Sequence, residues 1–130
     1  MITLSISTTR QSEFLDITRD IEKAVLNARI SDGLAMVYVP HTTAGITINE
    51  GADPSVQEDI QGMLNQLIPS KGSYRHREGN SPAHIKTSLI GSSVMVMIED
   101  GRLILGTWQS IFFCEFDGPR TRKVLIKIIP

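Results

Sequence analysis

Cysteine is nearly absent from this chain, and long apolar runs are absent altogether. The single cysteine, Cys114, excludes a disulfide within the chain and favours a reducing compartment, so we expect a cytoplasmic protein. No apolar run approaches the roughly 20 residues that a membrane helix needs, and Met1–Ser7 lacks the features of a signal peptide. A formal net charge of −1 argues against general nucleic-acid binding. We therefore expect neither a membrane nor a nucleic acid as partner.

The fold class follows from the spacing of the apolar residues. Short apolar or alternating runs predict strands at residues 2–7, 14–17, 34–40, 46–48, 94–98, 103–105, 108–116 and 124–129. Helical spacing predicts helices over residues 18–29, 53–67 and 81–90, and Asp100-Gly101 predicts a hairpin turn. Because the helices are too few to alternate with strands, we predict an α+β fold. It would be one domain, 1–130, of sandwich-like, mainly antiparallel sheets with about three helices packed on one side.

Only three histidines occur, and each lies in a polar or glycine-bounded segment. His41 follows the strand at 34–40, His76 lies in the polar loop 70–80, and His84 lies in the first turn of the helix at 81–90. Imidazole is the commonest metal ligand, and three protein ligands with one open position are typical of a catalytic zinc site. We therefore predict that these histidines converge on one divalent metal ion, with zinc favoured. The alternative is that each is an ordinary surface or hydrogen-bonded residue.

Acidic and amide side chains lie close to two of these histidines in the sequence. Asn49 and Glu50 end the strand at 46–48, which is only about 10 Å long, so we expect them to line the same pocket as His41. Glu50 would act as a general base or orient an imidazole. The alternative is that Glu50 only favours the start of the following helix. Glu78 shares the loop of His76 and is a candidate metal ligand or orienting partner.

Several further residues are candidates for binding a substrate. Lys86 follows the helix start that carries His84, where free backbone amides favour phosphate. Arg120 and Arg122 suit bidentate phosphate contacts, although a solvated turn is the alternative. Trp108 and Gln109 follow Gly106, which indicates a bulge or the close approach of a ligand. Trp108 is a candidate to stack on a flat heterocycle, and the alternative is that it belongs to the core.

In this order, these segments resemble the YjbQ family, whose members are also described as secondary thiamine-phosphate synthases. The matching residues are His41-Thr42-Thr43-Ala44, Ile48-Asn49-Glu50, Asp53-Pro54, Glu78-Gly79, Pro82-Ala83-His84-Ile85-Lys86, Leu89-Ile90-Gly91, Gly101-Arg102, Gly106-Thr107-Trp108-Gln109 and Glu115. The chain departs from the family pattern at Asn80-Ser81, where an acidic segment is shortened, and at Ser110, where glycine is usual.

The resemblance implies a homotrimeric α+β protein with a three-histidine metal site, which we expect at or near a subunit boundary. It also implies a weak ability to join a pyrimidine diphosphate to a thiazole phosphate with release of pyrophosphate. The metal, Lys86, Arg120 and Arg122 would then stabilise charge on the leaving group. Two alternatives remain: a metal-dependent hydrolase of a small phosphorylated metabolite, and a non-catalytic metal or metabolite binder.

Overall fold

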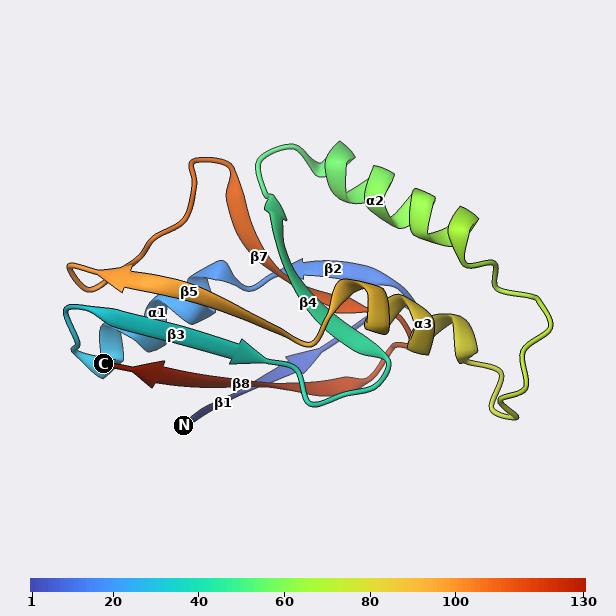
Figure 1. Cartoon of the computed structure of the whole chain (residues 1–130), viewed down its shortest axis with the longest axis horizontal. Helices are drawn as coiled ribbons and strands as arrows, with labels where there is room; N and C mark the ends of the chain where they lie inside the picture. The colour runs from blue at the N-terminus through green and yellow to red at the C-terminus, as the bar shows by residue number, and fades with distance from the viewer.

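The computed structural model describes residues 1–130 and contains two sheets with a shared core (Figure 1). The larger sheet has the strand order β1-β8-β3-β5-β6, with bounds Ile2–Ser7, Thr121–Ile129, Gly33–Tyr38, Ser93–Glu99 and Arg102–Leu103. The smaller sheet has the order β2-β7-β4, with bounds Glu13–Asp16, Gln109–Glu115 and Ala44–Glu50. Every strand pair is antiparallel. In Figure 1, β4 and β7 run steeply across the strands of the larger sheet.

The period-two alternation of each strand decides which side chains fill the space between the sheets. Val124 and Ile126 on β8 are buried there, as are Ile111 and Phe113 on β7. They belong to a core of 13 buried hydrophobic residues. Burying one such large side chain contributes about 1.5–3 kcal/mol. The core therefore packs β7 against β8, and the connection between these two strands borders the candidate site.

The three helices are α1 (Thr18–Ala28), α2 (Pro54–Leu67) and α3 (Ser81–Ile90). Leu64 on α2 and Ala83 on α3 pack with Phe112 on β7, so these helices cover the outer face of the smaller sheet. Ile21 and Ala24 of α1 instead belong to the core between the sheets. The predicted α+β class is confirmed, but only α2 and α3 share one side of the smaller sheet. The smaller sheet does not cover the whole inner face of the larger sheet. The apolar side chains of α1 cover the part that remains.

Two local predictions are confirmed, a helix start at Asp53 and a hairpin turn at Asp100-Gly101. The carboxylate of Asp53 accepts a hydrogen bond from the backbone N–H of Ser55 at 3.0 Å and caps the start of α2. Asp100 and Gly101 have φ values of 51° and 75°, and a two-residue hairpin of type I′ needs positive φ at both positions. These local signals fix where α2 begins and where β5 turns into β6.

Three strand boundaries differ from the prediction in ways that affect the site. β4 has seven residues, Ala44–Glu50, instead of the three predicted. β7 begins at Gln109, so Trp108 lies in the preceding loop. β8 begins at Thr121, which places Arg122 in a strand and not in a turn. No helix of the structure is both long enough and apolar enough to cross a lipid bilayer.

Candidate functional site

One polar cavity collects all three histidines of the chain. It has a volume of about 410 Å³ and no hydrophobic residue lines it. The lining residues are Pro40, His41, Thr42, Thr43, His76, Glu78, Asn80, His84, Arg120 and Arg122. They come from the β3–β4 connection, the loop before α3, the first turn of α3, and the region where β8 begins. Figure 1 shows these segments at one end of the molecule. The structure thus brings together the predicted histidines and Glu78.

His76 and His84 lie in direct contact at this cavity. Their ring centroids are 5.2 Å apart, and the ring planes are inclined at 82°. Two imidazoles bound to one tetrahedral zinc ion through bonds of about 2.0–2.1 Å hold their centres roughly 5 Å apart. The carboxylate Oε2 of Glu78 lies 3.9 Å from Nε2 of His76. These three side chains are therefore neighbours and are of the types that bind divalent metal ions.

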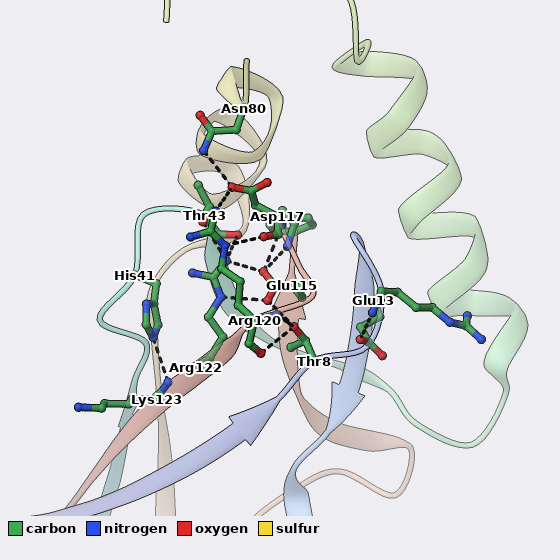
Figure 2. Close-up of polar contacts among 12 residues, drawn as sticks. Thr8, Glu13, His41, Thr43, Asn80, Glu115, Asp117, Arg120, Arg122 and Lys123 are labelled. Carbon is green, nitrogen blue, oxygen red and sulfur yellow. Dashed lines mark hydrogen bonds and ion pairs between the residues drawn. The ribbon is translucent and has the colours of Figure 1, made fainter. Parts of the chain in front are cut away.

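His41 is held in a different way from the other two histidines. Its Nε2 accepts a hydrogen bond from the backbone N–H of Lys123 at 3.0 Å (Figure 2). A neutral imidazole that accepts through one nitrogen carries its proton on the other, so Nδ1 offers a donor and not a lone pair. Burial, and then the charge of Arg122, lowers the pKa of His41 and favours this neutral form. In this orientation His41 adds no third ligand, and no group of three or more His, Cys, Asp or Glu side chains is arranged to hold an ion.

Arg122 forms a buried ion pair with Glu115 behind the histidines (Figure 2). Arg122 Nε donates to Glu115 Oε1 at 2.9 Å, and Arg122 Nη2 donates to Thr43 Oγ1 at 2.9 Å. The hydroxyl of Thr8 donates to Glu115 Oε1 at 2.8 Å. Burial alone would raise the pKa of Glu115, but hydrogen bonds from Arg122, Thr8 and the Asp117 N–H, with the charge of Arg122, lower it overall. Arg122 is only 4% exposed, so it is a neutralised core residue and not the free phosphate ligand that we predicted.

Arg120 also has a carboxylate partner, at the rim of the cavity. Its guanidinium lies 2.8 Å from Asp117 Oδ2, and its Nε donates to the backbone oxygen of Asp117 at 2.8 Å. Asn80 Nδ2 donates to the same Oδ2 at 2.9 Å, while Asn80 Oδ1 is buried without a hydrogen-bond partner. Asp117 therefore joins the residue before α3 to the β7–β8 connection. Much of the positive charge of Arg120 is compensated within the protein.

Lys86 does not line the histidine cavity. It lies in a second cavity of about 430 Å³, and the polar residues around it include Gln11, Ser12, Asn65, Ser70, Asn80 and Asp117. The start of α3 is also occupied, because the N–H groups of Ala83 and His84 donate to the backbone oxygen of Asn80 at 3.0 and 3.4 Å. Pro82 has no N–H to offer. The predicted phosphate site, made of this helix start with Lys86 and an arginine, is therefore not assembled.

Asn49 and Glu50 lie at the far end of β4 from His41. Ala44 pairs with Glu115 beside the histidine cavity, whereas Glu50 pairs with Gln109 at the opposite end of the strand. Because β4 has seven residues in an extended conformation, its two ends lie roughly 20 Å apart. Neither Asn49 nor Glu50 is among the residues that line the histidine cavity. Within one chain, the expectation that they share a pocket with His41 is wrong, because β4 is longer than predicted.

Trp108 and Gln109 lie beside Asn49 and Glu50 at the Glu50 end of β4. The N–H of Gly51 donates to the backbone oxygen of Trp108 at 2.8 Å, and Gln109 pairs with Glu50 in the sheet. The side chain of Trp108 is exposed, so it does not belong to the core of the chain. Glu50 Oε2 accepts from the N–H of Ala52 at 2.8 Å. The predicted site residues therefore form two groups, one at each end of β4, with Lys86 in its own cavity.

A protein-family model described as "UPF0047 protein YjbQ-like" matches residues 2–130. The chain belongs to the YjbQ family. A UPF0047 protein of Methanocaldococcus jannaschii is 56% identical over 124 residues, which cover 95% of this chain and 90% of that protein. The UPF0047 protein YugU of Bacillus subtilis is 52% identical over 128 residues, covering 98% of this chain and 97% of YugU.

Solved structures of YjbQ-family proteins share the whole fold. A crystal structure of a family member from Clostridium acetobutylicum is 56% identical and has a TM-score of 0.98, with 99% of this chain and 100% of that chain covered. A YbjQ-like protein from Sulfolobus solfataricus is 33% identical and has a TM-score of 0.95, with 98% and 94% covered. The architecture described above is therefore the family architecture.

Sequence reasoning gave no role to Thr8, Thr43 or Glu115, which join Arg122 in the network behind the cavity. A period-two signal was nevertheless present for Glu115 and for Arg122 itself. Arg122 lies on the same face of its strand as the buried Val124 and Ile126. Glu115 lies on the same face of its strand as the buried Ile111 and Phe113. Both charged residues thus occupy inward positions, Arg122 on β8 and Glu115 on β7. Nothing in the sequence showed that these two strands lie in facing sheets.

Proposed function

We propose that the histidine cavity binds one divalent transition-metal ion, with zinc favoured, and that the ion acts on a small phosphorylated metabolite. The observation that carries this proposal is the convergence of all three histidines, from three separate segments, on one cavity without hydrophobic lining. Imidazole ligands suit zinc and similar ions and disfavour magnesium. The free, buried thiol of Cys114 is consistent with a cytoplasmic location.

His76, His84 and Glu78 would hold the ion, because their side chains are already neighbours. When bound, the metal would supply Lewis acidity toward a phosphate oxygen or a bound water. His41 would contribute a hydrogen-bond donor from Nδ1 while Lys123 keeps its Nε2 engaged. His41 becomes a third imidazole ligand only if it gives up this backbone hydrogen bond and turns its lone pair toward the ion.

The family resemblance gives the proposal its narrower form, which is weak thiamine-phosphate synthesis with release of pyrophosphate. In this protein the metal would carry most of the leaving-group charge, since Arg120 and Arg122 are paired with Asp117 and Glu115. Metal-dependent hydrolysis of a phosphate ester is the second candidate. It is supported by the exposed carboxylate of Glu78 beside His76, which in this candidate would accept a proton from an attacking water and would not be a metal ligand.

We also propose that the chain acts as a homotrimer. The outer face of the larger sheet is not covered by any other part of the chain and exposes Tyr38, Met95, Met97 and Ile129. Exposed apolar patches of this kind mark association surfaces. Assembly would also allow Asn49, Glu50, Trp108 and Gln109 of one subunit to approach the histidine cavity of another. Light scattering should give three times the chain mass of 14.4 kDa, and a monomer mass at micromolar concentration would overturn this assembly.

The experiment for the proposed function has two steps on untagged protein. Elemental analysis after purification without chelators should find zinc at about one ion per chain. The zinc-loaded and chelator-treated forms are then compared on the two thiamine precursors and on a panel of phosphate monoesters. Product from the precursors only with metal supports the transferase, and ester hydrolysis supports the second candidate. Tight metal binding with no turnover would leave a non-catalytic binding protein, and the absence of metal binding would overturn the proposal.

A further inference from the structure

Lys86 is a buried cation for which the protein provides no anion. Its residue is only 8% exposed, although lysine is almost never buried without a charged partner. The Nζ donates to Oδ1 of Asn65 at 2.5 Å, and this neutral amide is its one hydrogen-bond partner. All ion pairs within 4.0 Å involve other residues. Two of the three ammonium protons of Lys86 therefore have no acceptor in the protein.

The surroundings of Lys86 are those of a small-molecule site. The cavity that it lines has a volume of about 430 Å³, within the usual range of about 300–1,000 Å³ for ligand pockets. Hydroxyl and amide groups of Ser12, Ser70 and Gln11 also line it and can donate hydrogen bonds to an oxyanion. Asp117 is the only carboxylate in the lining, and Arg120 and Asn80 already engage it. The Lys86 charge is thus left for a ligand.

We propose that this cavity is a second ligand site, which binds the oxyanion group of a small metabolite through the ammonium of Lys86. The site is separate from the histidine cavity, and the two share only Asn80 among their lining residues. Asn80 donates a hydrogen bond to Asp117, which lines only the Lys86 cavity. The proposal does not depend on metal binding at the histidines.

The test uses chelator-treated protein, so that no metal ion can bind the probe. Inorganic phosphate and acetate are added at constant ionic strength while the melting temperature is recorded. Phosphate, acetate or both should raise the melting temperature of the wild type by mass action, and the stronger of the two identifies the preferred group. Lys86→Met should bind roughly tenfold more weakly or worse, because a charge-assisted hydrogen bond is lost. Lys23→Met, which removes an exposed lysine on α1, is the matched control and should bind as the wild type does.

A second readout needs no variant and protects the test against a folding defect. Nuclear magnetic resonance of the lysine Cε groups in the wild type should show the Lys86 resonance shifting with added anion at constant pH, while the Lys23 resonance does not move. If neither anion changes the melting temperature or the Lys86 resonance, the cavity is not an oxyanion site. An equal response in Lys86→Met would also overturn the proposal.

Discussion

His41 accepts the backbone N–H of Lys123 through its Nε2, at a distance of 3.0 Å. The paired register of β3 and β8 ends at Tyr38 and Leu125, so the imidazole engages β8 just beyond the last pair. The ring therefore continues the hydrogen bonding between the β3 and β8 segments and also lines the histidine cavity. This double position separates His41 from His76 and His84, whose rings contact each other.

The first prediction concerns the pH dependence that His41 imposes on stability. The pKa of His41 is lowered from its ordinary value of 6.5 by burial and then by Arg122, so the folded state binds fewer protons than the unfolded state. The free energy of unfolding should therefore fall as the pH drops below about 6.5 and on through the lower folded pKa. Denaturant titrations of chelator-treated protein across this range measure the effect.

His41→Gln is the matched variant for this prediction. A glutamine oxygen can accept the Lys123 N–H but does not titrate, so the variant should fold and lose the part of the pH dependence that His41 contributes. If wild type and variant show the same slope against pH, His41 does not titrate with folding as described.

The second prediction concerns the ion pair of Glu115 and Arg122. Glu115→Gln should lower the free energy of unfolding by about 3–5 kcal/mol, because it leaves the buried guanidinium without its counter-charge. The double variant Glu115→Gln with Arg122→Met should be less destabilised than the sum of the single variants, since no unpaired charge remains. Additive losses in this double-mutant cycle would show that the pair is not coupled.

The third prediction concerns a close approach at the far end of β4. A Cβ added at Gly51 would lie 2.5 Å from the Cβ of Ser110, which is closer than real side chains come. Gly51→Ala should therefore destabilise the fold by about 1–3 kcal/mol. The second change Ser110→Gly removes the obstructing side chain and should restore most of this loss. A harmless Gly51→Ala in thermal unfolding would mean that this end of the sheet moves apart easily.

Local signals in the sequence predicted much of the fold. Asp53-Pro54 and Asp100-Gly101 act within a few residues, so the start of α2 and the β5–β6 turn could be placed without knowing the tertiary structure. The side of the smaller sheet on which α1 packs could not be predicted, because it depends on how the two sheets face each other. The length of β4 was underestimated, since Ala44-Gly45 has the composition of a loop but pairs with β7.

The candidate site was also predicted only in part, because some of its features are local in the sequence and others are not. The histidines stood out by their rarity and their polar surroundings, and the structure places all three at one cavity. The roles of Arg122 and Lys86 depend on neighbours far away in the sequence, namely Glu115 across the sandwich and Asn65 on α2. Charge alone could not distinguish a free cation from a neutralised one or from one enclosed in another cavity.

The central claim is that His76 and His84 form the metal-binding part of the histidine cavity, and zinc titration by calorimetry tests it most directly. Chelator-treated wild-type protein should bind about one zinc ion per chain in a saturable way. The double variant His76→Ala with His84→Ala should lose this binding, whereas His41→Gln should retain it. Absence of saturable binding to the wild type, or unchanged binding to the double variant, would contradict the claim.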